Sequence, residues 1–399
     1  MQTRAMAKIK TNYARFLQYL TVFSALLLVS CGGGGGACCT TSSGGTPSGV
    51  VVQQIATGYS HTCALVNGGV QCWGQNSYGQ LGNNSTTNSL VPVAVLGLTG
   101  GVQAIAAGGN HTCALLDNGG VQCWGRNSYG QLGNSSTADS LVPVAVFGLT
   151  SGVQAIAAGG YHSCAMVNGG VQCWGYNIDG QLGNSATTNS LVPVAVFGLT
   201  GGVQAIAAGG YHSCALVDGG AQCWGYNGDG ELGNSSTTNS LLPVAVSGLT
   251  SGVQSITAGN YHSCAMVNGG AQCWGQNSYG QLGNSSTTNN LVPGAVVGLT
   301  GGVQSIAAGG YHSCAMVNGG AQCWGRNSYG QLGNNLTTDS TVPVAVSGLT
   351  SGVQAIAAGG YHSCAMVNGG AQCWGYNIDG QIGNNSTTNS LVPVQVSGL

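Results

Sequence analysis

Residues 152–200 read GVQAIAAGGYHSCAMVNGGVQCWGYNIDGQLGNSATTNSLVPVAVFGLT. This stretch holds four short apolar segments, at 153–158, 162–167, 171–174 and 191–196, with turn-forming residues between them. Short apolar runs at this spacing are typical of all-β proteins. The stretch is one of seven copies, each marked by a His, a Cys two positions later and a following Cys-Trp-Gly; the seven histidines are His61, His111, His162, His212, His262, His312 and His362.

The repeat length predicts how the copies pack. Successive histidines are 50 or 51 residues apart. A single four-stranded unit cannot bury both of its faces, so the copies must pack side by side, and periods of about 40–50 residues are typical of propellers. We therefore predict an all-β fold for residues 50–399, a seven-bladed β-propeller with four-stranded antiparallel blades.

The second and third strands of each unit are predicted to form a tight hairpin. Asn168-Gly169 favours a two-residue type I′ turn, because both positions need φ > 0. Pairing outward from this turn places Cys164 opposite Cys173 in a non-hydrogen-bonded pair, with Cα atoms about 4.5 Å apart. That distance suits a disulfide. In the second unit, a three-residue turn with Gly119 in the left-handed region absorbs one extra residue.

We therefore expect one hairpin disulfide per blade. A metal site is the alternative, but the usual spacing is eight residues between the cysteines, whereas zinc motifs have about two to four. Unpaired buried cysteines are a further alternative. We expect no metal and no cofactor, and these seven bridges: Cys63–Cys72, Cys113–Cys123, Cys164–Cys173, Cys214–Cys223, Cys264–Cys273, Cys314–Cys323 and Cys364–Cys373.

The first 49 residues are predicted to export and anchor the chain. Residues 1–30 have the pattern of a lipoprotein signal peptide, with a basic start and an apolar stretch at 16–29 that is followed by Ser30 and Cys31. The end of this stretch resembles a bacterial lipobox, in which the Cys is acylated; an ordinary signal peptide with a chance Cys is the alternative. Residues 31–49 form a Gly/Ser/Thr-rich tether. The fate of Cys38 and Cys39 stays open, between intermolecular pairing and free thiols.

This pattern predicts an exported protein, an outer-membrane or cell-surface lipoprotein, with the periplasmic side also open. The lipid anchor would be its only attachment to the membrane. After residue 30 the chain carries two arginines against eight acidic residues, a net charge of −6. Binding to nucleic acid rests on several Lys or Arg contacts with phosphates, so we expect no nucleic-acid partner.

The repeated signature resembles a known family. Residues 162–166 (HSCAM) and 173–183 (CWGYNIDGQLG) are similar to the signature of the regulator of chromosome condensation repeat family, and the match recurs in all seven units. The resemblance implies a seven-bladed propeller. The resemblance would also imply the family's nucleotide-exchange activity on a small nuclear GTPase. We do not expect this activity here, because an exported protein does not meet a cytosolic GTPase. The even spacing of the repeats also leaves no room for an inserted loop.

Positions that differ between the seven units are the candidates for binding. A residue present in every unit serves every blade, so we expect the histidines to be hydrogen-bonded inside a blade and the tryptophans to anchor blade packing. The residues after Trp-Gly do vary, fall in equivalent loops and should form a ring on one propeller face. Drift among exposed turns is the alternative. The candidate binding face comprises Gln75, Tyr78, Arg126, Tyr129, Tyr176, Asp179, Tyr226, Asp229, Glu231, Gln276, Tyr279, Arg326, Tyr329, Tyr376 and Asp379.

The sequence offers little material for catalysis. No nucleophile, base and orienting acid stand out as a unique set. Asp179 with Asp229 or Glu231 would suit glycoside hydrolysis only with the carboxyl groups about 5–9 Å apart. We expect no enzyme but a protein-binding scaffold, because Tyr and Arg are enriched at binding hot spots. Its protein partner is of unknown identity. The alternatives are a carbohydrate- or cell-wall-binding surface protein and a structural surface-layer component.

Overall fold

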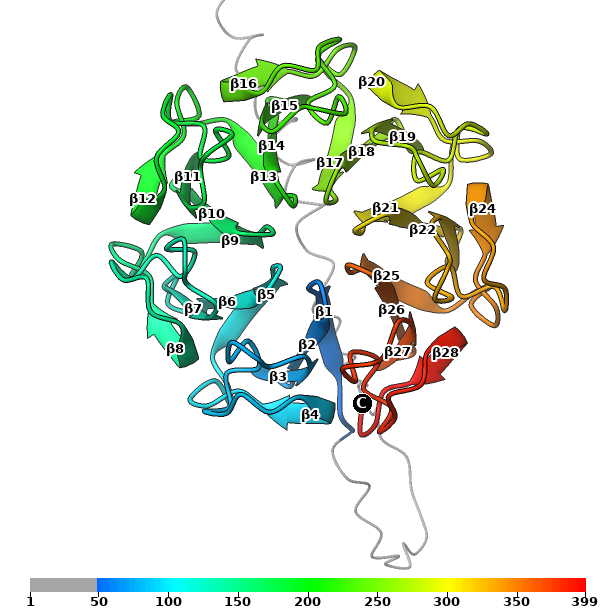
Figure 1. Cartoon of the computed structure of the whole chain (residues 1–399), viewed down its shortest axis with the longest axis horizontal. Coiled ribbons are helices and arrows are strands. Elements are labelled where there is room, and N and C mark those ends of the chain that lie inside the picture. Colours follow the sequence, from blue (N-terminus) through cyan, green and yellow to red (C-terminus); the bar gives the residue numbers. More distant parts are fainter. Residues whose placement is uncertain (1–48) are drawn as a thin grey trace, which may run out of the picture. The chain divides into compact units, whose positions relative to one another are not determined.

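The computed structural model describes residues 49–399, which form a ring of seven four-stranded antiparallel sheets (Figure 1). Each sheet consists of four strands that are consecutive in the sequence. The predicted all-β, seven-bladed propeller is therefore confirmed. The predicted signal peptide, the tether, the acylated Cys31, and Cys38 and Cys39 lie outside the described residues.

The strands have nearly the same bounds in every blade. Those of the first four blades are β1 (Val52–Thr57), β2 (His61–Val66), β3 (Gly69–Gly74) and β4 (Ser89–Ala94); β5 (Val102–Ala107), β6 (His111–Leu116), β7 (Val121–Gly125) and β8 (Ser140–Ala145); β9 (Val153–Ala158), β10 (His162–Val167), β11 (Gly170–Gly175) and β12 (Ser190–Ala195); and β13 (Val203–Ala208), β14 (His212–Val217), β15 (Gly220–Gly225) and β16 (Ser240–Ala245). Those of the last three are β17 (Val253–Ala258), β18 (His262–Val267), β19 (Gly270–Gly275) and β20 (Asn290–Ala295); β21 (Val303–Ala308), β22 (His312–Val317), β23 (Gly320–Gly325) and β24 (Ser340–Ala345); and β25 (Val353–Ala358), β26 (His362–Val367), β27 (Gly370–Gly375) and β28 (Ser390–Gln395).

The hairpin register follows the prediction. Asn168 and Gly169 have φ angles of 52° and 81°, and Cys164 pairs with Cys173 across β10 and β11. Gly119 turns the longer hairpin of the second blade with a φ of 78°. All seven predicted disulfides are present, with Cα–Cα distances of 4.0–4.1 Å, somewhat shorter than expected.

The fourth strand of each blade differs slightly from its predicted range. In the third blade it runs from Ser190 to Ala195, one residue earlier than predicted, and its pairing with β11 is irregular between Cys173 and Gly175. Pro193 lies in this strand and has no N–H to donate to a ladder, which confines the strand to the edge of the sheet. Every blade carries a Pro at this position.

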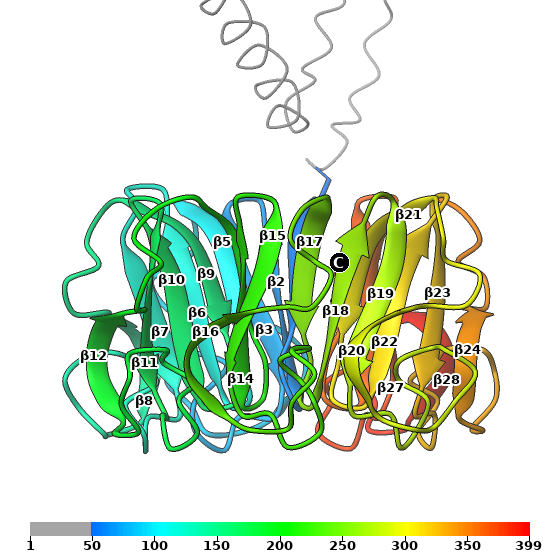
Figure 2. The same cartoon turned by 90° about the horizontal axis from the view of Figure 1, so that it is seen from above.

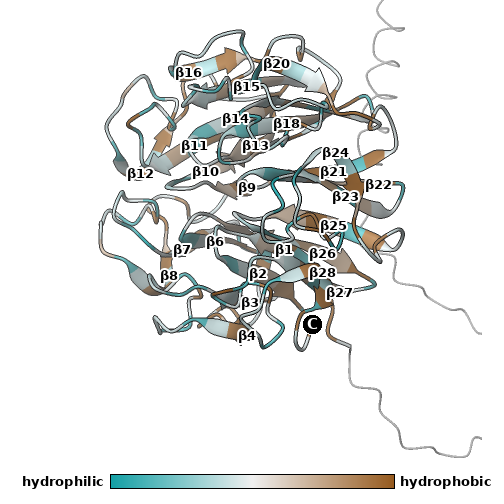
Figure 3. Ribbon diagram, turned by 45° about the vertical axis from the view of Figure 1, so that its right-hand side comes forward, coloured by the Kyte–Doolittle hydropathy of each residue, from teal (hydrophilic) through white to brown (hydrophobic). Residues whose placement is uncertain are grey.

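The hydrophobic core lies between neighbouring blades. At one such interface, Cys164, Cys173 and Leu182 of one blade pack with Ala215 and Trp224 of the next. The seven Trp side chains are at most 1% exposed. Figure 3 shows hydrophobic stretches within the strands and hydrophilic ones in many of the loops. Each blade thus completes its core only against its neighbour.

The repeated histidines hold adjacent blades together. His111 Nε2 lies 2.8 Å from Ser163 Oγ of the next blade, and this hydroxyl donates to the carbonyl of Gln131 (2.9 Å). Because the only hydroxyl hydrogen goes to the carbonyl, the ring must donate from Nε2, which leaves Nδ1 as an acceptor. The histidine bonds therefore run between blades, and the prediction of a bond inside a blade is wrong. The reason is the fold: the first residue of the second strand faces the neighbouring blade.

The ring closes by the same contacts that join the other blades. Trp73 Nε1 donates to the carbonyl of Gln381 (3.0 Å), and His362 Nε2 lies 2.8 Å from Thr62 Oγ1. The backbone N–H of Val52 donates to the carbonyl of Gly369 (3.0 Å). The first and last sheets are built from 52–94 and 353–395, so no strand is exchanged between them.

The strand register defines two faces of the disc, which Figure 2 shows edge-on. The turns between first and second strands lie at the same end as the loops between third and fourth strands, since Thr57 pairs with Thr62 and Gly74 with Ser89. We call this end the tyrosine face, for the residues described below. The hairpin turns such as 67–68, the connections between blades and the start of β1 lie on the opposite face.

Candidate binding face

The variable residues predicted from the sequence lie in the seven loops between third and fourth strands, and all of them except the buried Glu231 reach the surface of the tyrosine face. One buried Asn organises each loop. Asn177 Nδ2 donates to Asn184 Oδ1 and to the carbonyl of Ala186, and its Oδ1 accepts from the backbone N–H of Leu182. The corresponding Asn makes the same kinds of bonds in the other six blades. A constant frame therefore presents the variable side chains.

Five tyrosines that sequence reasoning did not select lie beside these loops. Each directly precedes a repeated histidine, and the position varies, because the first two units carry Ser60 and Asn110 instead. This variation between the units could have identified the position as part of the candidate binding face. Their rings form a continuous inner row, with centroids 5.5–6.0 Å apart from one blade to the next; the row is Tyr161, Tyr211, Tyr261, Tyr311 and Tyr361.

The two arginines are packed against tyrosine rings. The guanidinium carbon of Arg126 lies 5.1 Å from the ring centre of Tyr78 and 5.6 Å from those of Tyr129 and Tyr161. Arg326 lies 4.9–5.8 Å from the ring centres of four tyrosines: Tyr279, Tyr311, Tyr329 and Tyr361. Cations are attracted to ring faces at such distances, so both guanidiniums are held in place.

Three aspartates of the predicted face link neighbouring blades. Asp179 Oδ1 accepts from Asn239 Nδ2 of the next blade at 3.0 Å. Asp229 makes the same contact one blade further, and Asp379 Oδ1 accepts from Asn88 Nδ2 across the ring closure. Burial raises the pKa of Asp379. These partly exposed carboxylates thus link neighbouring blades by hydrogen bonds at the surface of the face.

Glu231 lies beneath the face rather than on it. Its side chain is fully buried, at the position that is Gln in the other six blades. Oε2 accepts from the backbone N–H of Asp229 (2.9 Å), whereas Oε1 has no hydrogen-bond partner among the described residues. Burial raises the pKa of Glu231 to about 8, so its carboxyl is mostly protonated at neutral pH. It is therefore unsuited to be the ionised partner in a glycosidase-like carboxylate pair.

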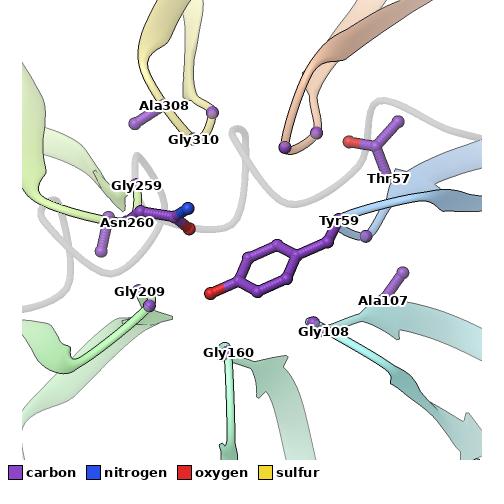
Figure 4. A pocket seen from close by; sticks show the side chains of 18 of the residues that line it. Thr57, Tyr59, Ala107, Gly108, Gly160, Gly209, Gly259, Asn260, Ala308 and Gly310 are labelled. Atoms are coloured by element: carbon purple, nitrogen blue, oxygen red, sulfur yellow. The ribbon is translucent and has the colours of Figure 1, made fainter. Parts of the chain in front are cut away.

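Tyr59 fills the centre of the ring. Figure 4 shows its side chain crossing the channel toward Gly160 and Gly209. A Cβ at Gly160 would lie 2.5 Å from the Tyr59 hydroxyl, so the facing blade needs glycine here. The remaining cavity of about 60 Å³ has room for no more than a few water molecules. The channel is thus closed to larger ligands, and the candidate site is the surrounding face.

Two other kinds of site are not found in the described part of the chain. Residues 49–399 hold no group of three or more His, Cys, Asp or Glu side chains that could bind a metal ion. Within the same residues, no helix is long and apolar enough to cross a membrane. The seven histidines are fully buried, and burial lowers their pKa values to about 3–4, which keeps them neutral.

The sheets and the loop-borne face define a seven-bladed β-propeller with one variable, side-chain-rich surface. A family model for the RCC1-like domain matches residues 39–273 and 155–399, and the chain belongs to this family. The ultraviolet-B receptor UVR8 of Arabidopsis thaliana is 35% identical over 100 residues, which are 25% of this chain and 23% of the receptor. The human probable E3 ubiquitin-protein ligase HERC4 is 32% identical over 107 residues, 26% of this chain and 10% of the ligase. The match thus spans less than a quarter of either relative.

Solved structures with the same fold cover most of the chain. Human WBSCR16 has a TM-score of 0.70 and 26% identity, covering 79% of this chain and 86% of that one. Yeast RCC1 (Prp20), in a crystal structure with Kap60 bound, has a TM-score of 0.74 and 21% identity, covering 93% and 91% of the two chains. At this identity, the likeness to the yeast protein shows the fold alone.

Proposed function

We propose that this chain is an exported, lipid-anchored propeller that binds a protein partner through its tyrosine face, without catalysis. One observation carries the proposal: both arginines and all thirteen tyrosines after residue 49 lie on this face or at its centre. Tyr and Arg, together with Trp, are enriched at the hot spots of protein interfaces. A chance distribution would place some of them in hairpin turns or blade connections on the opposite face.

The tyrosine face is also preorganised. Its half-buried rings pack edge to face, at a tilt or stacked, for example Tyr129 edge-on to Tyr176 with ring centres 5.0 Å apart and Tyr211 stacked on Tyr261 with ring centres 5.5 Å apart. Tyrosine has few rotatable bonds, and rings held by neighbours lose little conformational freedom on binding. Less entropy therefore opposes association.

The relatives support protein binding as a class. The yeast Prp20 protein has been crystallised with Kap60 and described for its binding to Gsp1p and histones. None of these partners transfers to this chain, since identities of 21–23% show the fold alone. The low positive charge also disfavours nucleic acid as the partner.

Capture with the full chain tests the tyrosine face. We expect Arg126→Gln/Arg326→Gln to weaken partner binding at least about thirtyfold, the equivalent of roughly 2 kcal/mol at a hot spot. Gln already stands at this position in the first and fifth blades, so the fold tolerates it. Proteins cross-linked to the wild type in envelope extracts of the source organism would be identified by mass spectrometry.

Asp218→Asn is the matched control, because Asp218 lies in a hairpin turn on the opposite face where five other blades carry Asn. A partner that both variants retain equally would show that the binding face is misplaced. Binding to a glycan array, lost in the arginine variant and without any protein partner, would favour the carbohydrate-binding alternative.

The export part of this proposal is supported by the seven disulfides, because such bridges form in oxidising compartments outside the cytosol; the anchor needs its own test. We expect Cys31→Ser to move the protein from the membrane fraction to the soluble fraction and to abolish labelling by a radioactive fatty acid. Cys38→Ser/Cys39→Ser serves as the control and should keep both properties. Unchanged labelling of the Cys31 variant would refute acylation at this residue.

A further inference from the structure

The tyrosine face repeats itself after 200 or 201 residues. The loop residues of the first three blades read Gln-Asn-Ser-Tyr, Arg-Asn-Ser-Tyr and Tyr-Asn-Ile-Asp, and those of the last three blades read the same. The fourth blade, with Tyr-Asn-Gly-Asp, stands alone between them. The first set comprises Tyr78, Arg126, Tyr129, Tyr161, Tyr176, Ile178 and Asp179; the second comprises Tyr279, Arg326, Tyr329, Tyr361, Tyr376, Ile378 and Asp379.

The geometry of the two sets is also repeated. The arginine-to-tyrosine distance across the first blade boundary is 5.1 Å in one set and 4.9 Å in the other. Tyr129 and Tyr176 lie 5.0 Å apart, and Tyr329 and Tyr376 lie 4.7 Å apart. Both isoleucines are exposed, at 59% and 60%. One difference is that Tyr311 adds a ring below Arg326, where the first set has Asn110.

From this repetition we propose that the tyrosine face carries two equivalent binding sites, one on blades 1–3 and one on blades 5–7. This proposal rests on the proposed function and adds the number of binding sites that each chain carries. Six of the ten charged residues after residue 49 occur as pairs repeated at this interval: the two arginines, Asp139 with Asp339, and Asp179 with Asp379. Charged residues, exposed isoleucines and ring contacts thus recur together, which places the same chemistry twice on one face.

The chemistry of each site indicates what it binds. Arg126 donates from Nε to Ser128 Oγ (3.3 Å), and its Nη groups donate to no other described residue, so they can take a carboxylate. Arg326 has the same arrangement with Ser328 (3.4 Å). The exposed isoleucine offers an apolar contact, and the aspartate beyond it accepts only from neutral amide groups among the described residues. Each site thus fits a peptide segment with an acid, an apolar residue and a base in succession.

A peptide selection followed by calorimetry tests this. A displayed library of random 12-residue peptides is enriched on the full-length protein, and the most enriched peptide is synthesised as the probe. We expect it to carry an acidic and a basic residue and to bind wild type with a stoichiometry of two. Arg126→Gln and Arg326→Gln should each bind one peptide, their double variant should bind none, and Asp218→Asn should bind two.

Linking two copies of the probe peptide gives a second measure of the number of binding sites. A tandem peptide with a flexible linker long enough to span both sites should bind wild type about a hundredfold more tightly than the single peptide, but gain little on either single variant. A stoichiometry of one for wild type, with binding lost in the double variant, would refute the two-site proposal and leave the proposed function standing. Peptide binding that survives in the double variant, or failure to enrich any peptide, would overturn the two-site proposal, and the former would contradict the proposed function as well.

Discussion

Acidification from pH 7 to about 5 is expected to unfold the propeller. Burial lowers the pKa of the seven histidines to about 3–4, whereas an exposed His has a pKa near 6.5. The unfolded chain therefore binds more protons, so the stability that the histidines contribute is full above pH 6.5 and is lost as the pH falls toward their folded pKa values. At pH 5 the loss is about 2 kcal/mol per His, or roughly 14 kcal/mol for seven. A typical domain has only about 5–15 kcal/mol of stability in all.

Proton uptake on unfolding measures this directly. At pH 5.5 each unfolded His binds about 0.9 proton, so the seven should take up about six. Glu231 acts in the opposite direction, since its raised pKa of about 8 makes the folded state hold a proton that the unfolded state releases. Calorimetry in buffers of different ionisation enthalpy gives the net uptake, and Glu231→Gln should raise it by nearly one. An uptake near zero would show that the rings are already charged or exposed in the folded protein.

Removal of the seven disulfides is expected to abolish folding. Each bridge closes a loop of 9 or 10 residues, which is worth about 2–3 kcal/mol by the chain-entropy model. Seven such bridges together exceed the usual stability of a domain. The full chain with all seven pairs replaced by Ala should therefore lack near-ultraviolet circular dichroism at 37 °C and be digested rapidly by protease.

A single replaced pair, such as Cys164→Ala/Cys173→Ala, should fold with a lower Tm. The oxidised wild type should resist reductant under native conditions, because its bridging cysteines are at most 1% exposed. Cys38→Ser/Cys39→Ser provides the control for general effects of Cys replacement and should leave the Tm unchanged. If the variant without bridges melts at the wild-type Tm, the disulfides do not stabilise the fold as argued.

The local sequence pattern was sufficient to predict the structure of a single blade. Asn168-Gly169 determines the hairpin turn, and the turn determines that Cys164 faces Cys173, because register within a two-residue hairpin depends on neighbouring residues alone. The number of copies then determined the number of blades, since each unit needs a neighbour to bury its second face. The positions of the variable loops on one face follow from the same strand order.

How the blades meet and what the face contains follow from packing around the ring, which no local pattern describes. His111 and Ser163 are 52 positions apart and come together because adjacent blades pack, which no hairpin rule describes. The same packing stacks Arg126 on Tyr78 of the preceding blade and buries Glu231 below the loops. The blade, its disulfide and the number of blades could thus be predicted from the amino-acid sequence alone. Contacts between blades form the histidine hydrogen bonds, the inner row of tyrosines and the packing of the two arginines against tyrosine rings. The distances between these residues are determined only when the blades pack into the closed ring.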